Sequence, residues 1–172
     1  TAAATMASSG AAVVPLVVMG AGGLWGASTP AGITSPIAAG RYKVSSGYLA
    51  PPRNNHRGVD MAAGSGTAIR GFAGGTVLFS GWGEGTLAGY GNVVVIQHTN
   101  GLRSLYAHMR ERNVATGDVL KTGHVLGLVG STGWSTGPHL HFEVGSQTGT
   151  DPGAFDRFNP LELTRIRRIL GS

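Results

Sequence analysis

The chain of 172 residues is long enough for one domain with a hydrophobic core, and its 30 glycines, which show no collagen-like period, favour a fold rich in tight turns. The net charge of +5 indicates an anionic partner, but no basic run interleaved with aromatic residues is present, so we expect no nucleic-acid partner. The absence of cysteine excludes a disulfide scaffold and a zinc site built from thiolates.

Residues 1–40 contain no charged side chain, and their apolar stretch 11–27 is interrupted by Pro15 and several glycines. A membrane-spanning helix needs about 20 strongly apolar residues, and a signal peptide begins with a basic segment, so neither pattern is met. We interpret residues 1–40 as an uncharged arm or linker rich in glycine and alanine, with membrane contact as the alternative. The chain starts at Thr1, so we expect a processed chain or a piece of a longer protein.

From residue 41 onward, short apolar or β-branched runs bounded by turn residues recur, and none is separated from the next by a segment of helical periodicity. The clearest runs are 75–81, 92–98 and 124–130. Asn100-Gly101 follows the second run, and this pair is typical of a two-residue hairpin turn. The pattern predicts an all-β fold, a compact antiparallel sheet or sandwich, with an open barrel as the alternative.

The tail, 159–172, is the one segment that predicts a helix. Asn159 suits the N-cap, Pro160 suits the first helical position, and Gly171 suits the residue that ends the helix. We assign residues 41–164 to one domain and residues 165–172 to a basic C-terminal tail.

The run "GPHLHFEV" (137–144) places His139 and His141 on one face of a strand, because side chains alternate along a strand. His56 and Asp60 stand four residues apart at the start of another apolar run, where a carboxylate needs a cationic neighbour. Catalytic zinc takes three nitrogen or oxygen ligands and a water. His56, Asp60 and one histidine of the pair supply this set, and the other histidine would move protons or stabilise an oxyanion.

Three motifs in this order, HxxxD in "HRGVD", YAH in "LYAHM" and HLH in "GPHLHFEV", resemble the lysostaphin-type zinc metalloendopeptidases. The resemblance covers roughly residues 45–162. It implies a compact antiparallel β fold with an active-site groove, one zinc ion, and hydrolysis of peptide bonds in bacterial peptidoglycan.

Carried over by position, the resemblance implies that His56, Asp60 and His141 bind the zinc ion, and that His108 and His139 are the catalytic histidines. A histidine titrates near neutral pH and suits proton transfer, but the sequence leaves the division of roles between these two open.

Three further residues are expected near the site. Glu143 lies on the same strand face as the histidine pair, where it would support a zinc ligand. Tyr106 and Trp134, next to the catalytic motifs, are expected to contact the substrate. His98 and His124 belong to no motif, and we expect them to be structural or surface residues.

The segment before His56 departs from the family pattern of Ser-Gly-Tyr/Phe-Gly-x-Arg. "SSGYLAPPRNNH" (45–56) has Leu49 in place of the second glycine and inserts two prolines before Arg53, so the groove wall is expected to differ. In some relatives an upstream asparagine blocks the open zinc position, and Asn55 leaves such a latent form as an alternative.

The sequence therefore predicts a zinc-dependent peptidoglycan endopeptidase, and a catalytically silent wall-binding or regulatory module of the same fold is the alternative. Expected partners are the peptidoglycan peptide and anionic wall polymers. The expected location is extracellular or in the cell envelope, and the alternative is a phage virion, where the chain would belong to a tail or tape-measure protein within a larger assembly.

Overall fold

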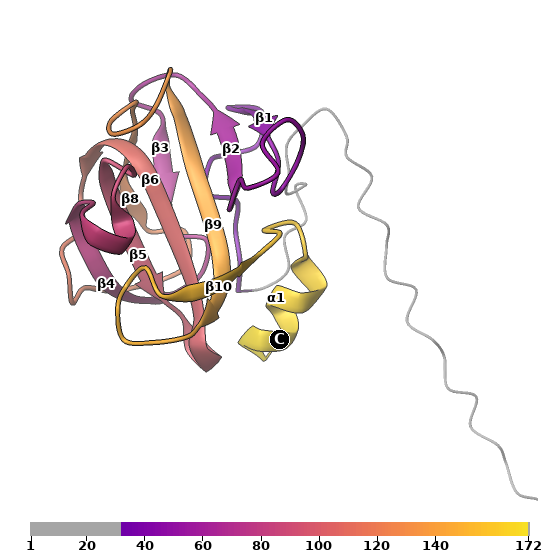
Figure 1. Cartoon of the computed structure of the whole chain (residues 1–172). Helices are drawn as coiled ribbons and strands as arrows, with labels where there is room; N and C mark the ends of the chain where they lie inside the picture. Colours follow the sequence, from indigo (N-terminus) through magenta and orange to yellow (C-terminus); the bar gives the residue numbers. More distant parts are fainter. Residues whose placement is uncertain (1–31, 172) are drawn as a thin grey trace, which may run out of the picture.

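The computed structural model describes residues 32–171, which form one curled β-sheet with a short helix at its edge (Figure 1). In chain order the elements are β1 (Lys43–Ser46), β2 (Val59–Ala62), β3 (Ala68–Arg70), β4 (Gly75–Trp82), η1 (Gly85–Leu87), β5 (Asn92–Gln97), η2 (Thr99–Gly101), β6 (Leu102–Arg112), β7 (Val119–Leu120), β8 (Val125–Val129), β9 (His139–Gln147), β10 (Phe155–Phe158) and α1 (Leu163–Leu170). The strand order is β1-β2-β9-β6-β5-β4-β7, with β10 beside β9, and β8 between β3 and β6. The all-β prediction is confirmed.

The β5–β6 connection is the predicted hairpin. Its strands are antiparallel, and Asn100 and Gly101 both have positive φ, at 55° and 75°. Asparagine and glycine tolerate this left-handed conformation better than other residues do, which is why the pair marks such turns.

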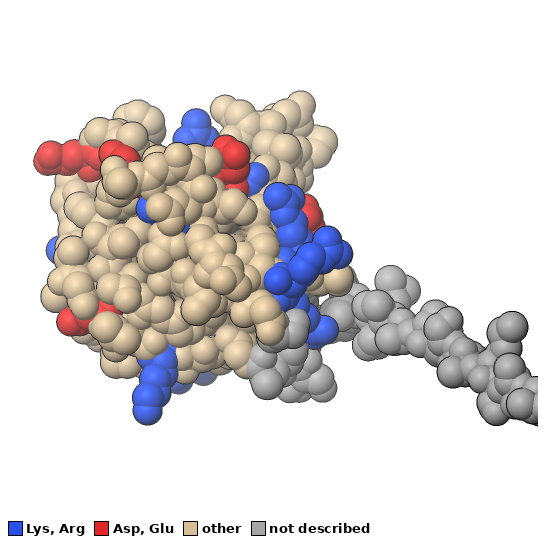
Figure 2. All heavy atoms as spheres, turned by 90° about the horizontal axis from the view of Figure 1, so that it is seen from below, with Lys and Arg blue, Asp and Glu red and all other residues tan. Residues whose placement is uncertain are grey.

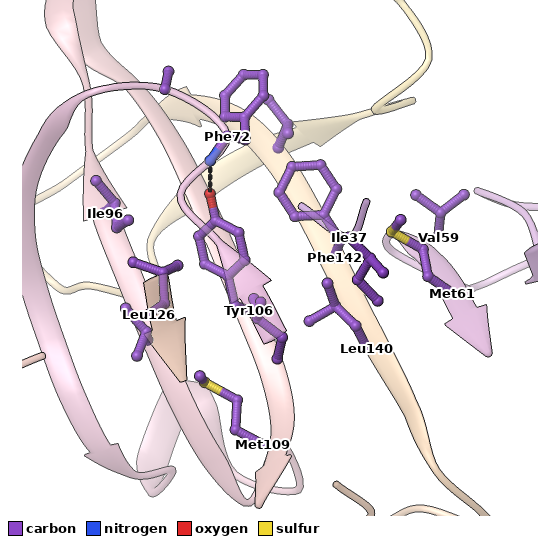
Figure 3. Packing of buried hydrophobic residues seen from close by; sticks show 14 of the residues in the cluster. Ile37, Val59, Met61, Phe72, Ile96, Tyr106, Met109, Leu126, Leu140 and Phe142 are labelled. Carbon is purple, nitrogen blue, oxygen red and sulfur yellow. Dashed lines mark hydrogen bonds between the residues drawn. The ribbon is translucent and has the colours of Figure 1, made fainter. Parts of the chain in front are cut away.

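Strand β9 lies in the middle of the sheet and divides its side chains between two environments. Leu140, Phe142 and Val144 are fully buried in the main core cluster, as their alternation predicts. The Phe142 ring lies 5.3 Å from the Tyr106 ring and 5.7 Å from the Phe72 ring, measured between centroids (Figure 3). This aromatic packing holds β9 on β6, so it also fixes the face of β9 that carries the histidines.

Residues 32–40, which the sequence analysis assigned to the arm, pack onto the sheet. Ile33 and Ile37 are buried in the main cluster, and the backbone of Thr34 donates a hydrogen bond to the carbonyl of Phe72. The rest of the predicted arm, 1–31, lies outside the described residues. Among residues 32–171, no helix has the length and apolar character needed to cross a membrane.

The C-terminal helix starts later than predicted. Residues 159–162 form a turn in which Asn159 accepts a hydrogen bond from the Leu161 amide, and α1 begins only at Leu163. The predicted N-terminus at Asn159 and Pro160 is therefore wrong, whereas Gly171 ends the helix with φ of 80° as expected. The predicted boundary at residue 165 falls inside α1, whose Ile166 is fully buried in the core.

Charged side chains are sparse on the surface, as their 12% share of the sequence indicates. Figure 2 shows a face that is mostly uncharged, with one group of lysine and arginine side chains at its right edge and others spread around the rim.

Candidate metal centre and catalytic cleft

The three predicted metal ligands come together on the β2–β9 pair. Asp60 in β2 is the direct antiparallel partner of His141 in β9, so both side chains leave the same face of the sheet. His56 reaches this point from the loop before β2. The His56 Nε2 atom lies 3.0 Å from Asp60 Oδ1 and 3.0 Å from His141 Nδ1, and His141 Nδ1 lies 2.8 Å from Asp60 Oδ1.

Each of these ligand side chains is held through its other polar atom. His56 donates from Nδ1 to the carbonyl of Gly47 at 2.7 Å. His141 donates from Nε2 to Glu143 Oε1 at 2.9 Å. Arg53 donates to Asp60 Oδ2 at 3.0 Å. In the neutral form of each ring, with its proton on the outer nitrogen, the inner nitrogen has a lone pair directed at the same point as Asp60 Oδ1.

This donor set fits a divalent metal ion. The three groups are all buried, and their ligand atoms lie within 4.8 Å of one another. A tetrahedral ion with bonds of about 2.0–2.1 Å holds its ligand atoms about 3.3 Å apart, close to the separations seen here. Three inward lone pairs, each with its outer partner already in place, match the arrangement that proteins use around bound metals.

The electrostatics of the cluster also favour a cation. Burial disfavours the charged form of Asp60, but the hydrogen bonds and charges of His141 and His56 outweigh this and hold its pKa well below the usual range. Burial likewise opposes charge on His141, yet its bonds to Asp60 and Glu143 raise its pKa to about 9. The carboxylates of Asp60 and Glu143 therefore make the buried position between the three ligand atoms attractive to positive charge.

His108 and His139 present their Nε2 atoms beside the cluster. His108 donates from Nδ1 to the carbonyl of Thr132 at 2.7 Å, and His139 donates from Nδ1 to the carbonyl of Gly137 at 2.8 Å. Their ring centroids lie 4.8 Å apart, and His139 Nε2 lies 3.7 Å from Asp60 Oδ1. Burial, aided by the nearby histidines, lowers the pKa of His108 to about 4, so this ring is neutral at pH 7 and its Nε2 atom carries a lone pair.

A β-bulge in β6 aims His108 at the cleft. Strand β6 pairs with β9 up to Ala107 and with β8 from Met109 onward, so His108 is the residue between two pairings. Its φ is 60°, in the left-handed region that is costly for a side chain with a Cβ. Tyr106 and Met109 both face the core although they are three residues apart, because His108 is the extra residue that shifts the alternation.

Glu143 is the centre of a buried network behind His141. Its Oε1 accepts hydrogen bonds from His141 Nε2 and from the Tyr90 hydroxyl, and its Oε2 accepts from Arg157 Nε at 2.7 Å. The Tyr90 ring stacks on the His141 ring at 5.6 Å between centroids. Burial raises the pKa of Glu143, but His141, Arg157 and Tyr90 together keep it below its usual value, so the side chain stays ionised at neutral pH.

Of the two residues expected to contact substrate, Trp134 fits and Tyr106 does not. Trp134 is 85% exposed, lines the cleft, and lies against Gly89, where an added Cβ would come within 2.9 Å of the indole ring. Tyr106 is fully buried, and its hydroxyl accepts a hydrogen bond from the Phe72 amide (Figure 3). The expectation that Tyr106 contacts substrate is therefore wrong.

The other two histidines lie outside the cluster. His98 is buried and bonds the Gly74 carbonyl and the Ser104 hydroxyl, whereas His124 is exposed in the loop before β8. Both positions agree with the structural and surface roles expected of them.

The cleft around the cluster has a volume of about 400 Å³, enough for a few residues of an extended peptide. Its wall includes Tyr90, Arg53 and Arg57, which sequence reasoning did not assign to the site. Arg53 carried a weak signal, because an arginine is expected shortly before the first histidine of the motif. Tyr90 gave none, since it reaches the site only through the fold of β4 and β5.

Comparison with known proteins agrees with this geometry. The sequence matches Peptidase family M23 over residues 54–152. The DD-carboxypeptidase/endopeptidase Mpg of Neisseria meningitidis serogroup B is 50% identical over 89 residues, which are 52% of this chain and 20% of Mpg. The glycyl-glycine endopeptidase ALE-1 of Staphylococcus capitis is 37% identical over 124 residues, which are 66% of this chain and 33% of ALE-1.

Among solved structures, a zinc-containing peptidase from Vibrio cholerae superposes with a TM-score of 0.62 at 26% identity, covering 76% of this chain and 40% of that one. The chain thus spans between a fifth and a third of the length of the two curated relatives. The family match covers more than half of the chain and includes every residue of the His-Asp-His cluster, and on this basis the chain belongs to Peptidase family M23.

Proposed function

We propose that this chain is a zinc-dependent endopeptidase that hydrolyses peptide bonds in bacterial peptidoglycan, in cell-wall lysis or remodelling. The observation that carries the proposal is the convergence of His56 Nε2, Asp60 Oδ1 and His141 Nδ1 beside two further histidines. Two imidazoles and one carboxylate suit zinc better than magnesium or calcium, which prefer oxygen ligands. The zinc-containing peptidase of similar fold and the endopeptidase names of the relatives support the same choice.

In this proposal His56, Asp60 and His141 hold the ion. When bound, zinc lowers the pKa of a water molecule and polarises the scissile carbonyl. The chain's own contribution is to fix the three ligands through Gly47, Arg53 and Glu143, so that the site is organised before substrate arrives.

His108 and His139 are the proposed catalytic histidines. Each ring has its Nδ1 proton tied to a backbone carbonyl, so each offers Nε2 to the cleft as a proton acceptor. After protonation the same atom becomes a donor, able to stabilise an oxyanion or to return the proton to the leaving amine. The two adjacent rings therefore supply both functions within one cleft.

The remaining site residues support this chemistry. Glu143 orients His141, and exposed Trp134 gives the substrate a flat apolar surface beside the histidines. A catalytically silent module would have one of the five histidine and aspartate groups replaced or turned away from the cleft, and all five are present in it.

We place this activity outside the cell or in the cell envelope, where peptidoglycan lies. A phage tail is the second setting that the sequence predicts for such a domain. Anionic polymers of the wall are proposed as partners, because the chain carries a net charge of +5.

Chelation tests the proposal. A gel containing purified peptidoglycan is expected to clear around the folded protein, to stay opaque after removal of metal by a strong chelator, and to clear again after zinc is added. Clearing that persists in metal-free protein would contradict the proposed mechanism.

Three histidine variants test the roles. His141→Ala is expected to lose bound zinc and activity, and His139→Ala is expected to keep zinc while losing activity. His124→Ala is the matched control, because His124 is exposed and lies outside the cleft. Zinc content is measured by elemental analysis and turnover by release of soluble fragments; full turnover in both active-site variants would show that the assignment is wrong.

A further inference from the structure

Two carboxylates and two guanidinium groups line the cleft, and three of these four groups are already paired within the protein. Asp60 contacts Arg53 at 3.0 Å. Glu143 is paired with Arg157 at 2.7 Å and is fully buried. The fourth is Arg57, which is exposed and forms no ion pair with any carboxylate in the part of the chain that the structure describes. The cleft therefore has one cation that is not neutralised by the protein.

The backbone holds Arg57 at a fixed place on the cleft wall. It stands between His56, whose side chain joins the metal cluster, and Gly58, both of which are buried. An added Cβ at Gly58 would lie 2.3 Å from the carbonyl oxygen of Phe142, so the chain is pressed against β9 at this point. Because the residues on both sides are buried, the backbone of Arg57 is held beside the metal cluster, and its side chain lines the cleft.

Arg57 shares the cleft with Tyr90, His108 and Trp134. A ligand between these side chains would meet the guanidinium. No further acidic side chain of the described residues lines the cleft to compensate that charge.

A guanidinium binds a carboxylate through two parallel hydrogen bonds, a geometry that an uncharged peptide group cannot match. A bound divalent ion would add positive charge to the same cleft and favour an anionic ligand further.

We infer that Arg57 binds a free carboxylate of the substrate peptide close to the scissile bond, so that the chain prefers cross-links bearing such a carboxylate over uncharged oligoglycine bridges. This inference rests on the proposed function, and it assigns to Arg57 the choice of substrate rather than the chemistry of cleavage.

The test uses cross-linked peptide dimers prepared from a peptidoglycan that the protein clears. One half of the preparation is left untreated, and in the other half the free carboxylates are converted to carboxamides. The wild-type protein is expected to show a kcat/KM about tenfold higher on the untreated dimers, which is the size of effect that one charge-assisted hydrogen-bonded pair gives. The ratio of the two kcat/KM values, untreated over amidated, is expected to fall as salt is added, because salt screens the charge of an exposed side chain such as Arg57.

Arg57→Gln is expected to bring the ratio close to one, and Arg70→Gln, which changes an exposed arginine outside the cleft, is expected to leave it as in the wild type. Zinc content and thermal unfolding check that both variants are folded. Equal cleavage of both dimers by the wild type, or an equal loss on both in Arg57→Gln, would overturn the inference while the proposed function stands. If the folded, zinc-loaded protein clears no peptidoglycan, the proposed function itself fails, and the inference fails with it.

Discussion

Replacement of Glu143 by glutamine tests whether the network behind His141 holds the metal site. Glu143 accepts hydrogen bonds on both oxygens, from His141 and Tyr90 on one side and from Arg157 on the other. A glutamine of the same shape has one oxygen and one NH₂ group. In either orientation this NH₂ group faces another donor, which is His141 Nε2 on one side or Arg157 Nε on the other. The charge that compensates the half-buried Arg157 is lost as well.

The cost follows from these contacts. Removing one partner of a buried ion pair costs about 3–5 kcal/mol, and loss of a group that orients a metal ligand lowers metal affinity by about 10–100-fold. Glu143→Gln is expected to lower the urea midpoint of the metal-free protein and to weaken zinc binding in competition with a chromophoric chelator. Glu111→Gln, at an exposed position of β6, is the control. Zinc affinity within twofold of the wild type in Glu143→Gln would refute this reasoning.

Three further predictions concern the frame of the site. Burial lowers the pKa of His98 to about 4, whereas the same side chain in the unfolded state has a pKa near 6.5, so the unfolded state binds the proton first as the pH falls. The free energy of unfolding of the wild type, relative to that of His98→Gln, is therefore expected to fall by about 3 kcal/mol between pH 7 and pH 4, as measured by urea unfolding. Gly58→Ala, whose Cβ would lie 2.3 Å from the Phe142 oxygen, is expected to weaken zinc binding, whereas Gly137→Ala, with nothing within 4 Å, is expected to leave it unchanged; equal affinities would contradict this. Phe142→Ala empties a fully buried position and is expected to cost about 3–5 kcal/mol by denaturant unfolding.

Features set by local pattern were predictable from the sequence. The runs 75–81, 92–98 and 124–130 correspond to β4, β5 and β8, because alternation and turn residues act over a few residues. The same rule placed His139 and His141 on one face of β9, and it is the pairing of β9 with β2 that brings Asp60 to His141.

Features set by tertiary packing were not predictable in this way. A bulge has no sequence signature as clear as Asn-Gly, so the alternation that puts Tyr106 in the core and the extra residue that turns His108 to the cleft were both hidden. Residues 32–40 lack charge and resemble a linker, but Ile33 and Ile37 reach the core through long-range contacts that composition does not reveal.

The departure from the family pattern before His56 lies between the contacts that hold two of the metal ligands. The loop 47–53 supplies Gly47, whose backbone carbonyl holds His56, and Arg53, whose side chain holds Asp60. The carbonyl contact does not depend on the identity of the side chain, and the long arginine side chain reaches Asp60 from an exposed backbone position. The inserted prolines fall between these two contacts, on exposed backbone. Variation between Gly47 and Arg53 therefore leaves the contacts that hold His56 and Asp60 in place.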